Sequence, residues 1–238
     1  MGGHKLTANS NFANGGAVPA PNEDVLDLGE VTAIAAGTYR DVYPFPGRDD
    51  LVVKVLRTGA EWQPGRPIRN FLKARSLCQR YRFMFREYES YLEAKLKQIE
   101  IGAPLPIAEL LWLQQTTLGL GMIAEKARGK DGQNARSLGT LRRENAIETD
   151  VLNALNAWIA LTEEYDIVAN DTNPENLMFD EACQTPRFVL VDGFGDPNPI
   201  QLKRLSRLAR KRARDRRHLR TATFLGLKWN SDKFKIER

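Results

Sequence analysis

Three polar residues in the C-terminal half of the chain have the types and spacing to bind a cation. Asp171 and Asn176 lie in the loop "NDTNPENL", between two apolar segments. Asp192 directly follows the apolar run Phe188–Val191 and precedes Gly193. Carboxylate and amide oxygens are the ligands that Mg²⁺ prefers, and Mg²⁺ sites usually also borrow phosphate oxygens. The three residues therefore predict a magnesium site that works together with a nucleotide.

Lys54 supplies a positive charge that suits the same chemistry. It lies inside the β-branched run "LVVKVL" at Leu51–Leu56. A lysine in an apolar strand is costly unless a negative group meets it. A phosphate and a glutamate on a helix would satisfy it.

These residues depend on elements that the sequence pattern predicts. Residues 31–56 read as a β-hairpin around a turn at "PFPGRDD", and 71–101 as one bent helix or two helices. Two strand-like segments follow, at 103–115 and 119–127. Residues 148–165 have the clearest amphipathic helical spacing, with Thr149 or Asp150 as the cap. A short strand over 187–191 precedes Asp192.

Composition excludes several classes of site. The chain has 238 residues, 42% of them hydrophobic, so it can form a sizeable core without disulfide or metal staples. Its two histidines, His4 and His218, lie in expected tail segments, which disfavours a Ser-His-Asp triad or a histidine metal site. Only two cysteines and no membrane-length apolar run predict a cytoplasmic protein without a transmembrane segment.

The positive charge is concentrated near the C-terminus. The formal net charge is +5, but Lys203–Arg220 alone contains ten Lys or Arg against one Asp, so the rest of the chain sums to −4. This pattern fits a terminal helix packed on the protein with a solvated arginine face. It equally fits a contact with nucleic acid, an anionic lipid or polysaccharide, or an acidic protein.

Each motif alone also has a plainer interpretation. Asp171 and Asn176 could stabilise a turn, "VDGFGD" could be a tight turn, and Lys54 could extend to solvent from an edge strand. Their order along the chain favours the chemical interpretation. A glycine-containing loop, a strand lysine, a helix, an Asp–x4–Asn loop and a strand-end Asp follow one another from Leu28 to Asp196 and resemble protein kinases and their relatives.

The resemblance implies roles for individual residues. In "IAAGTYRDVY" it makes Gly37, Tyr39 and Val42 part of the glycine-rich loop, with Ala35 and Arg40 in place of the first and third glycines. Lys54 would bind the nucleotide phosphates and pair with Glu87 of the helix, for which Glu89 is the alternative. Glu125 would contact the nucleotide from a hinge near 125–128. Asp171 would act as the base, and Asn176 and Asp192 would bind Mg²⁺.

The catalytic loop departs from the kinase pattern at two positions. Ala169 stands where a histidine is usual, and Asn173 replaces the lysine or histidine that helps to neutralise the transferred phosphoryl group. Within the kinase-like proteins, the pieces "GTYRDVY", "FREYESYL", "YDIVANDTNPENLM" and "VLVDGFGD" are most similar to the PhoP regulatory network protein YrbL family. Proteins of this family are small, bacterial and kinase-like in fold.

The resemblance implies an α+β, two-lobed protein-kinase-like fold. We expect a leader without regular structure at 1–22, a small β-rich N-lobe at 25–126, a short helical C-lobe at 127–200 and a basic helical segment at 201–238. Only 42 residues follow Asp196, fewer than the peptide-docking region of a typical protein kinase needs. This favours a small molecule, a saccharide or an atypical protein as phosphoryl acceptor.

Two functions follow from the resemblance. The first is an ATP-dependent phosphotransferase that uses Mg²⁺. The alternative is a nucleotide-binding pseudokinase, a regulator whose basic segment at Lys203–Arg220 contacts an anionic partner. Nucleic-acid binding by that segment is a third possibility, and it predicts strong salt dependence.

Overall fold

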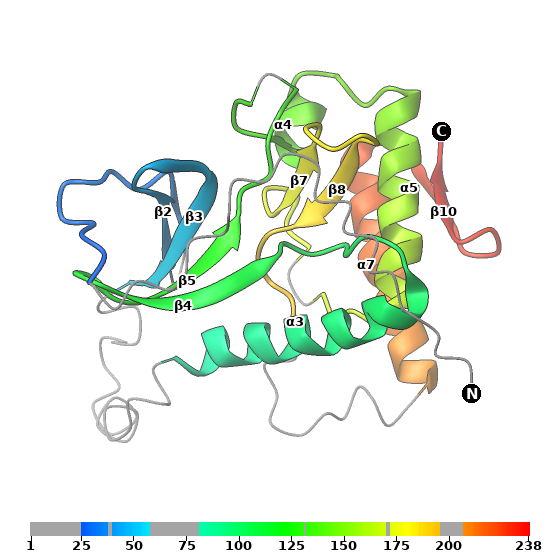
Figure 1. Ribbon diagram of the computed structural model, residues 1–238. Helices are drawn as coiled ribbons and strands as arrows, with labels where there is room; N and C mark the ends of the chain where they lie inside the picture. Colours follow the sequence, from blue (N-terminus) through cyan, green and yellow to red (C-terminus); the bar gives the residue numbers. More distant parts are fainter. Residues whose placement is uncertain (1–24, 38–39, 58–80, 131, 170–171, 196–206) are drawn as a thin grey trace, which may run out of the picture.

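The computed structural model describes residues 25–37, 40–57, 81–130, 132–169, 172–195 and 207–238. A five-stranded sheet with one long helix beside it forms one part of the molecule, and a small three-stranded sheet with further helices forms the other (Figure 1). The predicted α+β class is confirmed. The two-lobed, kinase-like arrangement and the predicted domain boundaries stay predictions.

The larger sheet is antiparallel throughout and has the strand order β1-β2-β3-β5-β4. The predicted hairpin is present, because β2 and β3 pair directly across a turn in which Gly47 has a φ of 75°. The strands are β1 (Ala35–Ala36), β2 (Arg40–Phe45), β3 (Arg48–Leu56), β4 (Leu110–Thr116) and β5 (Gly119–Glu125).

Strand β3 lies at the centre of this sheet and is buried on both faces. Successive side chains of a strand point to opposite faces. Val53 and Val55 pack in a small cluster with Ile123, whereas Val52 belongs to the main core. Lys54 has the parity of Val52 and so points to the same face, where Met84 of the neighbouring helix is buried.

Helix α3 (Arg82–Ile101) lies beside the larger sheet (Figure 1). Its buried residues Met84, Glu87, Tyr91 and Ala94 recur every three or four positions, which places them on one face of a helix. The helix ends at Gly102, whose left-handed φ of 71° allows its N–H to donate to the Gln98 carbonyl at 2.8 Å. Residues 71–80 of the predicted helix lie outside the described residues.

The smaller sheet contains β6 (Arg136–Ser137), β7 (Leu177–Asp180) and β8 (Arg187–Leu190), all antiparallel. Two helices belong to this part, α4 (Leu138–Arg143) and α5 (Thr149–Glu164). The prediction of α5 is confirmed, but its cap was assigned to the wrong residue. Glu148 is the N-cap, without a side-chain capping bond, because Thr149 and Asp150 already lie inside the first turn.

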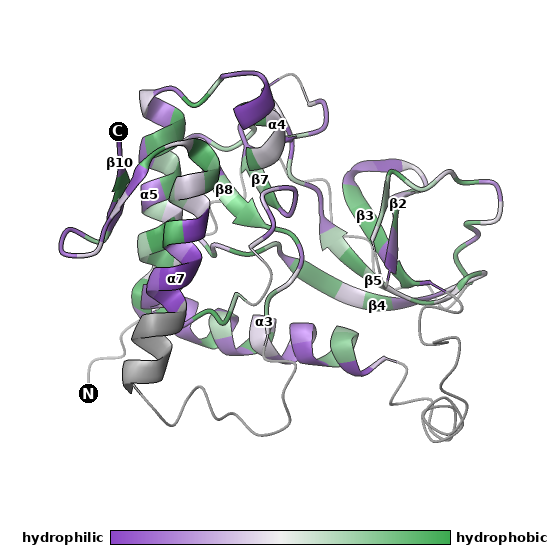
Figure 2. Ribbon diagram, turned by 180° about the vertical axis from the view of Figure 1, so that it is seen from behind, coloured by the Kyte–Doolittle hydropathy of each residue, from purple (hydrophilic) through white to green (hydrophobic). Residues whose placement is uncertain are grey.

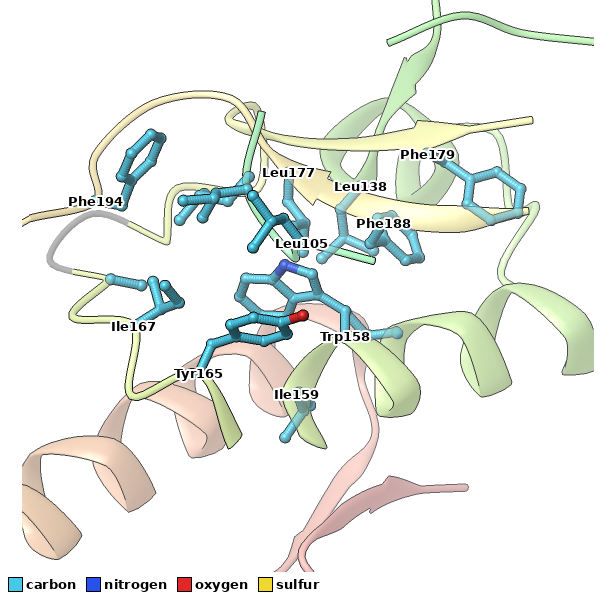
Figure 3. Packing of buried hydrophobic residues seen from close by; sticks show 14 of the residues in the cluster. Leu105, Leu138, Trp158, Ile159, Tyr165, Ile167, Leu177, Phe179, Phe188 and Phe194 are labelled. Atoms are coloured by element: carbon cyan, nitrogen blue, oxygen red, sulfur yellow. The ribbon is translucent and has the colours of Figure 1, made fainter. Parts of the chain in front are cut away.

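The main core extends from Val52 and Met84 to the place where α5 meets the smaller sheet. Figure 3 shows Trp158 and Tyr165 gathered with Leu105, Leu138 and Phe188. The polar atoms of the two large aromatic side chains are satisfied there. The Trp158 indole N–H donates to the Pro106 carbonyl at 2.8 Å, and the Tyr165 hydroxyl donates to the Ala103 carbonyl.

The C-terminal region contains a helix and a hairpin. Helix α7 (Arg207–Leu225) lies next to α5 and shows mainly hydrophilic residues when seen from behind (Figure 2). The hairpin of β9 (Lys228–Asn230) and β10 (Lys235–Glu237) was missed in a segment predicted to be helical throughout. Among the described residues, no helix is both long and apolar enough to cross a membrane.

Candidate functional site

A buried ion pair joins the central strand of the larger sheet to α3. Lys54 Nζ lies 3.0 Å from Glu87 Oε1, and the two residues are only 4% and 2% exposed. Lys54 Nζ also donates to the Val191 carbonyl at 2.5 Å. The rival partner, Glu89, is exposed on α3. The structure thus brings Lys54 and Glu87 together directly beside Asp192.

The Lys54–Glu87 pair follows from two periodicities. The two-residue period of β3 turns Lys54 toward α3, and the helical period of α3 turns Glu87 toward the sheet. Two charges in a dry interior must pay a desolvation cost, which only close contact and extra hydrogen bonds can offset. Replacing such a pair by apolar residues is often neutral or stabilising, so its burial is weak evidence for a stabilising role.

Asp192 follows β8 and lies at the entrance to a turn with two left-handed glycines. Gly193 and Gly195 have φ values of 82° and 93°. The Gly193 N–H donates to Asp192 Oδ1 at 2.5 Å. A Cβ atom on Gly195 would lie 3.0 Å from the Arg86 carbonyl oxygen, so only glycine lets this turn approach α3 so closely.

Arg40, on β2, connects the two carboxylates. Its Nη1 is ion-paired with Glu87 Oε2, and its Nε donates to Asp192 Oδ2 at 3.0 Å while Nη2 binds Asp192 Oδ1. The Arg40 side chain is 12% exposed. Burial alone would raise the pKa of Asp192, but the charge and hydrogen bonds of Arg40, with help from Lys54, hold that pKa below its usual value. Asp192 is therefore ionised, and Arg40 neutralises its charge at a site that is 36% exposed.

The sequence interpretation assigned no role to Arg40 beyond the loss of a glycine. One signal could have identified it. Val42 lies directly opposite Lys54 in the β2–β3 register, and Arg40 has the same parity as Val42. An arginine at that position points to the face that carries Lys54, which accounts for its contact with Glu87 but not for the approach of Asp192.

The remaining loop residues are only partly described. Gly37 lies between β1 and β2, where its N–H donates to the Arg40 carbonyl at 2.8 Å, and an added Cβ would lie 3.1 Å from that oxygen. Tyr39 lies outside the described residues. Glu125 ends β5 and is exposed. It pairs with Leu51, three positions along β3 from Lys54.

The loop before β7 is fastened to the Asp192 turn through its backbone. The Asn176 carbonyl accepts a hydrogen bond from the Val191 N–H at 2.9 Å, which places Asn176 next to the start of the turn. The Val168 carbonyl accepts from the Gly195 N–H at 2.9 Å, and Ala169 forms a β-bridge with Phe194. Asp171 itself lies outside the described residues.

The oxygen donors of Asp192 and Asn176 fit a magnesium ion in type and in number. Mg²⁺ is commonly held by one or two protein oxygens together with phosphates and water. Among the described residues, no three His, Cys, Asp or Glu side chains come together as a metal site. Both carboxylate oxygens of Asp192 are bonded to Arg40, so an ion fits only where that contact opens.

The model of the PhoP regulatory network protein YrbL family matches residues 26–223. The match covers most of the chain, including β1–β8, α3 and nearly all of α7. The chain belongs to the YrbL family. No curated protein matches it.

The matched region of this YrbL-family protein includes the basic helix, two of whose arginines point inward. Arg214 is ion-paired with Glu163 of α5, and its guanidinium stacks 4.8 Å from the Phe234 ring centroid. Arg217 donates to the Ala169 carbonyl at 2.7 Å. These two residues support the interpretation of α7 as a helix packed on the protein, and the part of the basic segment before Arg207 lies outside the described residues.

The sequence interpretation places His218 in a tail segment, but the structure buries it within α7. It is 1% exposed and lies between Trp229 and Phe234, with ring centroids 4.7 and 5.6 Å away. The hairpin β9–β10, which the sequence did not predict, supplies both aromatic rings and so creates the pocket. Burial, together with the charges of Arg217 and Arg214, lowers the pKa of His218 to about 3.

Proposed function

We propose that this protein is an ATP-dependent phosphotransferase with a two-lobed, kinase-like architecture. The observation that carries the proposal is the buried Lys54–Glu87 pair, whose lysine also contacts the residue before Asp192. Nucleotide phosphates would bind between the Lys54 face of the sheet and the Asp192 turn. The acceptor would be a small molecule, a saccharide or an atypical protein target.

The resemblance to kinases implies a role for each of these residues. Lys54 would bind the α- and β-phosphates, and Glu87 holds its ammonium group in place. Asp192 and Asn176 would hold Mg²⁺, which neutralises phosphate charge when it is bound. Asp171 would orient the acceptor hydroxyl and take its proton. Gly37 and Val42, with Tyr39, would cover the nucleotide, and Glu125 would lie near its base.

A second candidate is a regulator that binds a nucleotide but does not catalyse phosphoryl transfer. Two observations favour it. Asp192 is bonded to Arg40, and Ala169 stands in place of a side chain that could bond within the catalytic loop. The partner of such a regulator would distinguish the nucleotide-bound protein from the nucleotide-free protein. An anionic partner would suit the basic segment Lys203–Arg220.

Calorimetric titration with ATP, with and without Mg²⁺, tests the shared nucleotide site. Asp192→Asn is expected to lose the Mg²⁺-dependent part of binding. Asp41→Asn is the matched control, because Asp41 pairs with Arg57 on the same hairpin, away from Lys54. Absence of ATP binding to the wild-type protein would refute both candidates.

Turnover then separates the two candidates. The enzyme predicts that Asp171→Asn retains ATP binding and loses phosphoryl transfer in an acceptor screen or slow ATP hydrolysis. The regulator predicts that wild-type protein and Asp171→Asn bind ATP equally and that neither releases ADP above background.

A further inference from the structure

The guanidinium of Arg40 uses all three of its nitrogens on two carboxylates. Nη1 contacts Glu87, while Nε and Nη2 form a bidentate contact with the two oxygens of Asp192. A fork of this kind is the strongest arginine–carboxylate geometry. Both carboxylate oxygens of Asp192 are therefore bonded to Arg40.

The charges in this cluster balance. Lys54 and Arg40 carry two positive charges, and Glu87 and Asp192 carry two negative charges. A divalent cation that approached the balanced cluster would gain little attraction from it. Without Arg40 the cluster would carry one net negative charge, centred on Asp192, and would attract a cation in a partly dry environment.

The two carboxylates differ in what they would lose if Arg40 moved. Glu87 would keep its 3.0 Å contact with Lys54 and stay paired. The Asp192 side chain is 36% exposed and would keep the Gly193 N–H as a hydrogen-bond donor. Water or a cation can reach it, so release of Arg40 from Asp192 leaves no deeply buried unpaired charge.

We propose that Arg40 is an internal cation that competes with the divalent metal for Asp192 and thereby sets the metal dependence of nucleotide binding. The inference rests on the proposed nucleotide site and adds a specificity-determining residue to it. In the nucleotide-free protein Arg40 occupies Asp192, and a metal–nucleotide complex binds only with displacement of the guanidinium from that carboxylate.

The first test is calorimetric titration of the non-hydrolysable analogue AMP-PNP, in excess Mg²⁺ and in EDTA. The measured quantity is the affinity for AMP-PNP in Mg²⁺ divided by the affinity in EDTA. Arg40→Gln is expected to increase this ratio by about tenfold over wild type, because the metal no longer has to displace the guanidinium from Asp192. Arg57→Gln is the matched control. It removes an arginine from the same hairpin, one that pairs with Asp41, and should leave the ratio unchanged.

Arg40→Lys provides a second variant, since it keeps the charge and loses the bidentate fork. It should shift the ratio in the same direction but less far, and thermal unfolding of every variant verifies the fold. An unchanged or smaller ratio in Arg40→Gln, with nucleotide bound by the wild type, would overturn the role of Arg40 and leave the proposed function standing.

A measurement without nucleotide tests the competition between Arg40 and the metal separately from the proposed nucleotide site. Mn²⁺ alone is titrated into the protein and the free ion is followed by electron paramagnetic resonance. Tighter Mn²⁺ binding by Arg40→Gln than by wild type, abolished by adding Asp192→Asn, supports the competition even where no AMP-PNP binds. If no AMP-PNP binds, equal Mn²⁺ binding by wild type and Arg40→Gln would overturn the proposed competition.

Discussion

Arg217 of α7 donates a 2.7 Å hydrogen bond to the backbone carbonyl of Ala169, two residues before Asp171. The same loop is bonded on its other side to the Asp192 turn through Gly195. The C-terminal basic helix is thus tied to the backbone that leads into the candidate catalytic loop. This contact gives at least one arginine of the basic segment a structural role.

Replacing Arg217 should therefore destabilise the fold. In Arg217→Gln the partly buried Ala169 carbonyl loses a charged donor, so the free energy of unfolding should fall by about 1–3 kcal/mol. Arg220→Gln, at an exposed position on the same helix, should stay within about 0.5 kcal/mol of wild type. Urea unfolding measures both. Equal urea midpoints for the two variants would show that the contact between Arg217 and Ala169 does not contribute to stability.

Glu87 and Glu89 differ by two positions on α3 and should respond very differently to loss of charge. Glu87→Gln leaves Lys54 and Arg40 without their shared carboxylate in a buried place, which should cost about 3–5 kcal/mol. Glu89→Gln should change the stability by less than about 0.5 kcal/mol because Glu89 is exposed. Denaturant unfolding of both variants decides the matter, and similar values would contradict the assignment of Glu87.

The kinase resemblance predicts the Lys54–Glu87 pair, and local periodicity explains why the two side chains face each other in the structure. Each residue's direction depends on the period of its own element, and the apolar neighbours reveal that period. The predicted positions of β4, β5 and α5 rest on the same kind of signal. The Glu148 cap was misjudged because helix boundaries depend on backbone geometry within one or two residues.

Arg40 and His218 show where sequence reasoning stops. The environment of Arg40 comes from Asp192, 152 positions away, and no local pattern reports that approach. His218 lies in a segment dense with arginine that the sequence interpretation treats as a tail, and the β9–β10 hairpin supplies the two rings that pack against it. That hairpin consists of two strands of three residues, too short for a two-residue alternation to stand out.

The Asp192 turn should depend on the absence of a side chain at Gly195. Gly195→Ala combines a left-handed φ of 93° with contacts at 3.0 Å to the Arg86 carbonyl and the Ser90 hydroxyl. We expect a loss of about 2–3 kcal/mol and weaker ATP binding, because the turn must move away from α3.

Gly132→Ala is the control for the turn, since Gly132 has a φ of 73° and open space around its Cβ position. It should cost about 1 kcal/mol and leave ATP binding unchanged. Thermal unfolding and calorimetry of both variants make the comparison. An equal cost would mean that backbone strain alone, without the contact with α3, determines the effect.

Buried His218 should make the protein less stable in mild acid. Its pKa is lowered to about 3 in the fold by burial and by the nearby charges of Arg217 and Arg214, against an unfolded value of about 6.5. Between these values the unfolded chain binds a proton that the folded chain does not. Stability is therefore unaffected above the unfolded pKa and falls as the pH drops below it, by up to about 1.4 kcal/mol per pH unit.

His218→Phe should remove this part of the pH dependence, because phenylalanine can occupy the space between Trp229 and Phe234 without binding a proton. Urea unfolding at about pH 7 and about pH 5 gives the change in the free energy of unfolding for each protein. Carboxylates with lowered pKa values, such as Asp192, lose their stabilising effect at lower pH and do so equally in both proteins. The wild type should lose more stability than the variant, and an identical loss would show that folding does not lower the pKa of His218 below its unfolded value.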